Sequence, residues 1–129
     1  MAEAIYNRLT NSTDASSAGT RVDGVGETLR EFGQRPEVAS FTLDVMRDAN
    51  YDINDKRQTQ LTQDMLGNYD LVVSMAGKRY TPRWLSDAPN YEYWKIIDPK
   101  GRSYAITKHA KHEVERKVRN LVASQGTSA

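Results

Sequence analysis

The chain has 129 residues, enough for a single domain with a sizeable buried core. Hydrophobic residues make up 38%, charged residues 27%, and the net charge is +1, so composition indicates neither a nucleic-acid nor a membrane partner. The chain has no cysteine, which excludes disulfides, thiolate metal sites and a thiol nucleophile. No apolar run is long enough to span a membrane. We expect a cytoplasmic protein without a cofactor.

The first part of the chain predicts one clear helix followed by less regular segments. Residues 1–10 have helical periodicity, with an apolar face formed by Ala2, Ile5, Tyr6 and Leu9. Turn residues at 11–14 end this helix. The small residues at 15–18, closed by Gly19, indicate a brief strand, and the charged, glycine-containing segment 20–35 is expected to be a loop with little order.

The middle of the chain predicts a helix and then a buried strand. Pro36 and Glu37 suit the first turn of a helix. Its inner side is expected to be Val38, Phe41, Val45, Met46 and Ala49. Thr62 can cap a short helix, and the apolar run at 71–73 is typical of a buried parallel strand.

The last third predicts three elements and a tail. We expect a helix over 76–86 that Pro82 interrupts, a second buried strand over 93–97, and a long helix over 104–123. The inner face of the last helix is Ala110, Val114, Val118, Leu121 and Val122. The small polar residues 123–129 are expected to form a mobile tail. Strands alternating with helices predict an α/β domain with a mostly parallel sheet.

Four segments carry a family resemblance: MAEAIYNRLT at 1–10, SSAGT at 16–20, YDLVVSM at 69–75 and YWKIIDP at 93–99. Their order and spacing resemble low-molecular-weight protein tyrosine phosphatases over residues 1–122. The resemblance implies a flavodoxin-like, three-layer fold. Its first, central strand runs into a Cys-x5-Arg phosphate loop, which would end just before Met1. We expect the chain to lack that strand and loop, either because the start codon is placed too late or because the protein is a pseudophosphatase.

Asp98 is the one catalytic position that the resemblance carries over. On its own, Asp98-Pro99 indicates a turn that ends a strand. The resemblance implies instead the general acid that protonates the departing tyrosyl oxygen in phosphate monoester hydrolysis. An acid without a nucleophile forms no phosphoenzyme, so Asp98 is expected to be vestigial in this chain.

The residues after Asp98-Pro99 depart from the family pattern. Lys100-Gly101-Arg102 stands where the family usually carries aromatic residues that pack against phosphotyrosine. Lys100 and Arg102 could attract an anionic substrate, such as a phosphoprotein or a small phosphate ester, although a solvated turn is the favoured interpretation. Arsenate reductases of the same fold need further cysteines after the 69–75 strand, and residues 76–92 contain none.

Three other groups of residues have a structural interpretation that we favour. His109 and His112 have a spacing that suits two metal ligands, but a solvated basic face is favoured, and no metal is expected. The basic region 100–122 lacks the interleaved aromatics typical of nucleic-acid binding. The aromatic residues Tyr80, Trp84, Tyr91, Tyr93 and Trp94 are expected to pack in the core, although an exposed subset could line an interaction surface.

Loss of a central strand bears on whether the fold is stable. About three large buried side chains would go with it, at roughly 1.5–3 kcal/mol each, against a typical domain stability of about 5–15 kcal/mol. We therefore expect rearranged strand pairing, or a homodimer through exposed strand edges. The functional expectation is a low-molecular-weight phosphatase-like domain that is inactive as given. The alternatives are a non-enzymatic binding or regulatory module and, third, an arsenate reductase-like protein.

Overall fold

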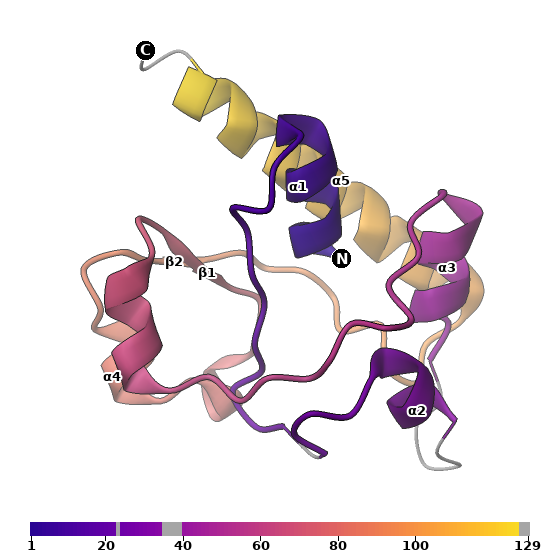
Figure 1. Ribbon diagram of the computed structural model, residues 1–129, viewed down its shortest axis with the longest axis horizontal. Helices are drawn as coiled ribbons and strands as arrows, with labels where there is room; N and C mark the ends of the chain where they lie inside the picture. The colour runs from indigo at the N-terminus through magenta and orange to yellow at the C-terminus, as the bar shows by residue number, and fades with distance from the viewer. Residues whose placement is uncertain (23, 35–39, 127–129) are drawn as a thin grey trace.

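A computed structural model describes residues 1–22, 24–34 and 40–126. Its elements in chain order are α1 (Ala2–Thr10), α2 (Leu29–Gly33), α3 (Thr42–Asp48), the 3-10 helix η1 (Gln63–Asn68), β1 (Val72–Ser74), the 3-10 helix η2 (Lys78–Tyr80), α4 (Arg83–Ser86), β2 (Tyr91–Tyr93) and α5 (Tyr104–Gly126). Helices α1 and α5 lie on one side of the two strands, and η1 and α4 lie on the other (Figure 1). The expected α/β architecture is confirmed.

The sheet has two parallel strands within the described residues. The register pairs Val72 with Tyr91, Val73 with Glu92 and Ser74 with Tyr93. The Val72 amide donates to the Asn90 carbonyl at 2.8 Å, and the Trp94 amide donates to the Ser74 carbonyl at 2.9 Å. Because bonding alternates along a parallel strand, the amide and carbonyl of Val73 point away from β2.

The second strand lies earlier in the chain than we predicted. It covers Tyr91–Tyr93, not residues 93–97, and both Glu92 and Tyr93 are exposed. Asn90 sets this register, because its side-chain amide donates to the carbonyls of Leu66 at 3.0 Å and Tyr69 at 2.9 Å. The apolar run that suggested a strand has another role, since Trp94 enters the core directly after β2.

The strand predicted over 15–18 and closed by Gly19 is wrong. Among the described residues this segment forms a single isolated parallel bridge, between Gly19 and Gln60. The Gly19 amide donates to the Thr59 carbonyl at 2.9 Å, and the Leu61 amide donates to the Gly19 carbonyl at 2.8 Å. A Cβ at position 19 would lie 2.7 Å from a methyl group of Val22, so this close approach requires glycine. Segment 16–20 therefore pairs with the chain before η1 and not with β1.

The segment expected to be a loop over 20–35 contains helix α2. Thr28 and Glu31 form a capping box at its start. The Glu31 amide donates to Thr28 Oγ1 at 3.2 Å, and the Thr28 amide donates to Glu31 Oε1 at 3.3 Å. The Thr-x-x-Glu spacing is a capping-box pattern that the sequence contains, but the glycines around it favoured the prediction of a loop.

The helix predicted to begin at Pro36 is described only in part. Pro36, Glu37 and Val38 lie outside the described residues, and α3 covers Thr42–Asp48. Two of its predicted inner residues, Val45 and Met46, are buried as expected.

Three other predicted elements are close to the observed ones. Pro82 separates η2 from α4, as the interruption in 76–86 predicted. Thr62 precedes η1 but makes no side-chain capping bond. Helix α5 continues three residues past its expected end at Ala123, so the expected tail does not begin there. Residues 127–129 lie outside the described part of the chain.

The core lies where α1, α3 and α5 meet the end of β2. Its central cluster is Ile5, Met46, Trp94, Val114 and Val118. The predicted inner face of α5 is confirmed, because Ala110, Val114 and Val118 are buried and Leu121 and Val122 pack against the cluster. Leu9 is 41% exposed and was wrongly placed on the inner face of α1. No helix within residues 1–22, 24–34 and 40–126 is long and apolar enough to cross a membrane.

Replacing Met46 with alanine tests this core. Met46 is fully buried between α3 and its neighbours, so we expect Met46→Ala to lower the free energy of unfolding by about 2–5 kcal/mol. Leu9→Ala serves as the control, with an expected change within about 0.5 kcal/mol. Urea unfolding followed by circular dichroism gives both values, and equal losses would contradict this assignment of the core.

The free edge of β1 tests the expected homodimer. In the described chain β1 pairs with β2 alone, and an unpaired strand edge favours association. We expect a dimer at high protein concentration, measured by size-exclusion chromatography with light scattering. Val73→Pro removes the amide that points to the free edge and keeps the ladder to β2, so it should remain monomeric. A wild-type chain that is monomeric at every concentration would argue against this pairing.

Candidate functional site

Both strands end at the same edge of the sheet, because they run parallel. The segments 75–82 and 94–103 leave the sheet at this carboxyl edge. In open α/β sheets, ligands bind outside the carboxyl ends of the strands. This edge is therefore the candidate site, and it includes the three residues that the sequence singled out, Asp98, Lys100 and Arg102.

Asp98, Lys100 and Arg102 lie in one short turn after β2. The Lys100 amide donates to Asp98 Oδ1 at 3.0 Å, and the Arg102 amide donates to the Pro99 carbonyl at 3.0 Å. Gly101 has φ of 74°, which the third position of a type II turn requires. All three side chains are exposed. The turn interpretation of Asp98-Pro99 is thus observed, while the acid role of Asp98 stays a prediction.

A hydrogen bond from the Tyr104 hydroxyl fixes the chain after this turn to α3. The Tyr104 hydroxyl donates to Asp48 Oδ2 at 2.6 Å, and the Tyr104 ring meets Phe41 edge to face, with centroids 6.1 Å apart. Ser103 Oγ accepts the Ile106 amide at 3.2 Å and caps α5. Sequence reasoning missed these anchors, although a serine directly before a long helix is a capping signal.

The positive end of α1 carries its own counter-charge. Glu3 lies in the first turn and pairs with Lys56 at 2.5 Å, and its carboxylate is partly buried. Burial lowers the pKa of the Met1 amine. Two smaller effects are that of the Glu3 carboxylate, which raises this pKa, and that of the Lys56 ammonium group, which lowers it further. An acidic side chain at a helix N-terminus offsets the helix dipole there. This end of α1 is therefore less suited to an anion than an uncharged first turn would be.

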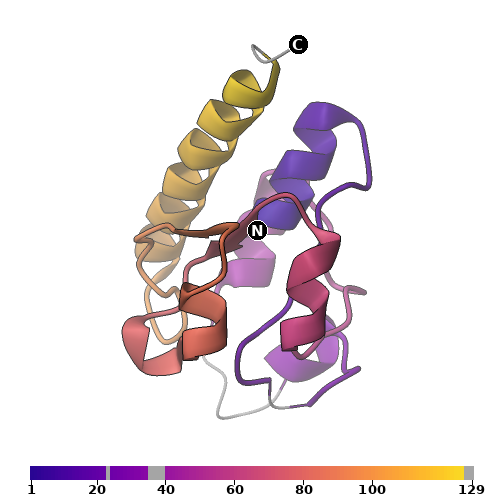
Figure 2. The ribbon, with the colours of Figure 1, turned by 90° about the vertical axis from the view of Figure 1, so that its left-hand side faces the viewer.

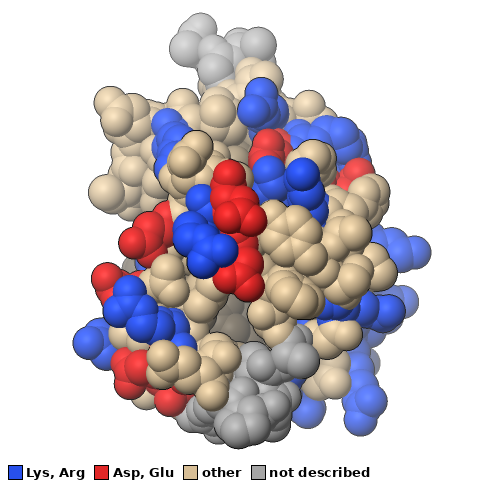
Figure 3. Space-filling model, turned by 90° about the vertical axis from the view of Figure 1, so that its right-hand side faces the viewer, with Lys and Arg blue, Asp and Glu red and all other residues tan. Residues whose placement is uncertain are grey.

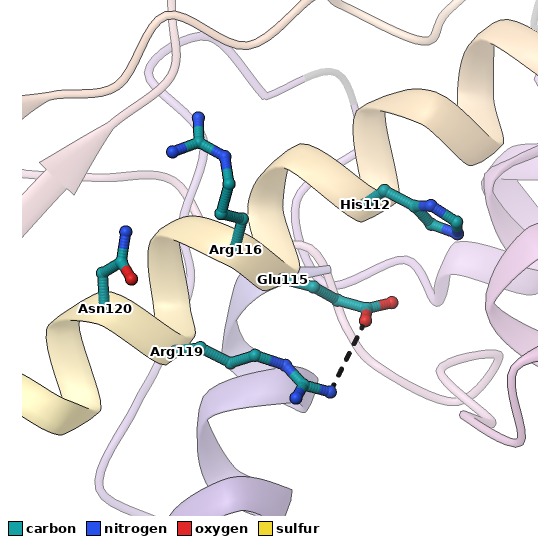
Figure 4. Close-up of a pocket in the computed structure, with 5 residues that line it drawn as sticks. All are labelled: His112, Glu115, Arg116, Arg119 and Asn120. Atoms are coloured by element: carbon teal, nitrogen blue, oxygen red, sulfur yellow. Dashed lines mark ion pairs between the residues drawn. The ribbon is translucent and has the colours of Figure 1, made fainter.

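A shallow hollow lies along the outer face of α5 (Figure 4). It is lined by His112, Glu115, Arg116, Arg119 and Asn120, all from this one helix. Arg119 lies 4.0 Å from Glu115, and Arg116 pairs with Glu113 at 3.0 Å. Because these cations have carboxylate partners on the helix, the basic character of 100–122 is partly neutralised here.

His109 and His112 are both exposed on α5. Among the described residues, no group of three or more His, Asp or Glu side chains is placed to share a metal ion. Both histidines therefore lie on the solvated helix face that we predicted.

The expected aromatic core is only partly present. Trp94 is buried, and its indole donates to Glu92 Oε2 at 2.7 Å. Tyr80 and Tyr93 are exposed, so the core prediction is wrong for them. Trp84 is half-buried and lines a second hollow, of about 360 Å³, together with Gln63, Leu66, Asp87, Ala88 and Pro89.

In the middle and on the left of Figure 3, acidic and basic side chains lie next to one another. Arg47 pairs with Asp44 at 3.3 Å and with Asp48 at 3.6 Å, and Arg30 pairs with Asp55 at 3.3 Å. The helices α2 and α3 therefore present a balanced surface and not a patch of one sign.

Comparison with solved structures supports the resemblance seen in the sequence. The chain superimposes on Wzb from Vibrio vulnificus, in complex with benzylphosphonate, with a TM-score of 0.73 at 18% identity, covering 95% of this chain and 87% of Wzb. A mutant of YwlE from Bacillus subtilis gives 0.66 at 19% identity, covering 97% and 88%. Both are low-molecular-weight phosphatases, so the expected flavodoxin-like fold is confirmed.

A sequence comparison finds a relative among the arsenate reductases, which we named above as an alternative. The glutaredoxin arsenate reductase of Synechocystis sp. (strain ATCC 27184 / PCC 6803 / Kazusa) is 26% identical over 81 residues. The alignment covers 61% of this chain and 61% of that protein's length. No protein-family model matches the chain. Relatedness to low-molecular-weight phosphatases and arsenate reductases is supported by these findings together.

Tyr104→Phe tests the anchor of the Asp98 turn through its pH dependence. The hydrogen bond to Asp48, desolvation and the Asp48 charge raise the pKa of Tyr104. A phenol with a raised pKa stabilises the fold fully below its unfolded pKa of about 10, and this contribution is lost at higher pH. We expect wild type to be more stable than Tyr104→Phe at neutral pH and the difference to shrink above pH 10.

Urea unfolding at a series of pH values measures that difference. Tyr69→Phe is the matched control, because Tyr69 is exposed and has no hydroxyl bond in the described structure. A difference between wild type and Tyr104→Phe that does not change with pH would contradict the anchor.

Proposed function

We propose that this chain is a phosphatase-fold domain that does not hydrolyse phosphate esters by itself and acts by binding. One observation carries the proposal: the Asp98-Pro99 turn stands at the carboxyl edge of a phosphatase fold, while the sequence contains no cysteine. Without a thiolate, the chain cannot form the phosphoenzyme on which a cysteine phosphatase depends.

The class of phosphate compound is suggested by a structural neighbour. Vibrio vulnificus Wzb was solved with benzylphosphonate, which joins an aromatic ring to a phosphonate group. The corresponding reaction is hydrolysis of an aromatic phosphate monoester, in which an acid protonates the departing oxygen. In this chain Asp98 would hold that position, with Lys100 and Arg102 beside it as exposed cations.

The charge at α1 fits a binding role better than a hydrolytic one. Glu3 and Lys56 form an ion pair at the positive end of this helix, where an anion would otherwise gain from the dipole. A phosphate group placed there would meet the Glu3 carboxylate. The proposed role is therefore that of a non-enzymatic binding or regulatory module.

The second candidate is a part in arsenate reduction. The sequence relative from Synechocystis is a glutaredoxin arsenate reductase, and this observation alone favours the candidate. Reduction of arsenate through a disulfide relay needs thiols, which this chain would have to obtain from another molecule.

A phosphatase assay tests the proposal. With p-nitrophenyl phosphate, the 129-residue chain should give no rate above the buffer blank, and Asp98→Asn should give the same result. Hydrolysis by wild type that Asp98→Asn abolishes would overturn the proposal. Arsenate with reduced glutathione and glutaredoxin tests the second candidate, and arsenite formation above a blank without the chain would favour it.

The reading frame upstream of the Met1 codon separates the remaining alternatives. Codons for a strand and Cys-x5-Arg would make the natural protein an enzyme. An in-frame stop codon shortly upstream would favour the binding module. The p-nitrophenyl phosphate assay on the extended chain would then show whether Asp98 acts as an acid.

A further inference from the structure

A basic cluster lies in the first loop at the carboxyl edge of the sheet, and the proposed function does not involve it. We define it as Arg21, Lys78, Arg79 and Arg83. Arg21 and Arg79 lie against the Tyr80 ring, and Lys78 and Arg83 are within three residues of Tyr80 in the chain. All four cations are exposed, and Tyr80 is 45% exposed. Three of them come from η2 and α4, which lie below the strands in Figure 2, and Arg21 comes from the loop after α1. The contact of Arg21 with Tyr80 joins residues that are far apart in the sequence.

Tyr80 holds two of these cations in place. The guanidinium carbon of Arg21 lies 5.3 Å from the centre of the Tyr80 ring, and that of Arg79 lies 5.7 Å from it. Both distances are within the range of cation–π attraction. The ring thus restrains two long side chains that would otherwise lose entropy on binding a ligand.

The backbone beneath the cluster is also fixed. The Tyr80 amide donates to the Gly77 carbonyl at 2.9 Å, and Thr81 Oγ1 donates to the same carbonyl at 2.9 Å. The Ala76 amide donates to Ser74 Oγ at 3.2 Å, which ties this turn to the end of β1. Arg79 and Tyr80 therefore stand on a short, bonded element and not on a free loop.

The cations of the basic cluster differ in pairing from Lys111 and Arg116 of α5. No ion pair joins Arg21, Lys78, Arg79 or Arg83 to a carboxylate within the described residues. On α5, by contrast, Lys111 pairs with Glu115 at 2.6 Å, and Arg116 pairs with Glu113. Exposed cations without an ion-pair partner within the described residues favour an acidic partner, because complementary charge steers association.

We propose that the basic cluster docks an acidic polypeptide segment, rich in Asp and Glu, of another protein. The planar fork of a guanidinium group matches a carboxylate in bidentate geometry. Arg and Tyr are also the residues that most often dominate protein–protein affinity. Single-stranded nucleic acid fits less well, because it needs open aromatic faces for base stacking, and two guanidinium groups already lie over Tyr80.

Fluorescence anisotropy with labelled poly-L-glutamate tests the docking surface. Wild type should bind the probe, and salt should weaken the binding because the contacts are exposed. The double variant Arg21→Ala/Arg79→Ala should bind about tenfold or more weakly, the loss typical of interface anchors. The matched control is Arg116→Ala/Arg119→Ala, which removes the same charge from α5 and should bind like wild type.

Tyr80→Leu separates positioning from net charge. It leaves all four cations in place and removes the ring that restrains Arg21 and Arg79, so affinity should fall while net charge is unchanged. Circular dichroism confirms that each variant is folded. An unchanged affinity in Tyr80→Leu would overturn the positioning role of Tyr80.

Three outcomes would overturn the docking surface itself. One is no binding of poly-L-glutamate by wild type. Another is equal weakening in the two double variants, which would mean a general charge effect. The third is tighter binding of a labelled oligothymidylate that the Arg21→Ala/Arg79→Ala variant loses, which would assign the cluster to single-stranded nucleic acid.

Discussion

Trp94 leaves the end of β2 and shares one buried cluster with Ile5 of α1, Met46 of α3, and Val114 and Val118 of α5. This contact joins the sheet to three helices, although the sheet has only two short strands in the described chain. Because Trp94 follows β2 directly, its burial also sets where the segment 94–103 leaves the strand. The position of the Asp98 turn therefore depends on hydrophobic packing that lies several residues away from it.

The second constraint is the way charges are paired. Most described ion pairs join neighbours on one helix, as Arg47 does with Asp44 or Arg116 with Glu113. Such exposed pairs contribute little to stability, but they reduce the pull of these surfaces on an anionic partner. In the basic cluster, Tyr80 positions two cations, and no ion pair within the described residues joins any of the four to a carboxylate. Basic composition alone would have indicated α5, whereas the cation–π contacts of Tyr80 indicate η2.

The fold of this protein and the chemistry of its candidate site are separate questions. The arrangement of α1, α5 and the parallel strands matches that of Wzb and YwlE, while the sequence has no residue that could act as a thiolate nucleophile. A shared fold does not imply a shared reaction, because function depends on the site that the fold carries. At the carboxyl edge of its sheet this chain has an exposed acid in a turn and several exposed cations, and the proposed binding role rests on these residues.

Local sequence patterns were sufficient for the long amphipathic elements. The apolar positions of α5 and the end of α1 at Asn11 could be read directly, because helical periodicity and turn residues act over a few neighbours. The Thr-x-x-Glu box of α2 was equally local, and the glycines around it hid the signal. The Asp98 turn was also predicted, since Asp, Pro and Gly determine it within five residues.

Only the tertiary structure decided the pairing of distant segments. Asn90 shifts β2 toward Tyr91 by bonding to Leu66 and Tyr69, and segment 16–20 bonds to the chain before η1 and not to a strand. The contact of Arg21 with Tyr80 likewise joins residues from two separate loops. The sequence by itself determined the helices α1 and α5, the turn at Asp98 and the absence of a thiol chemistry. Strand register and the basic cluster required the folded chain, because hydrogen bonds and cation–π contacts between distant residues leave no periodic signal in the sequence.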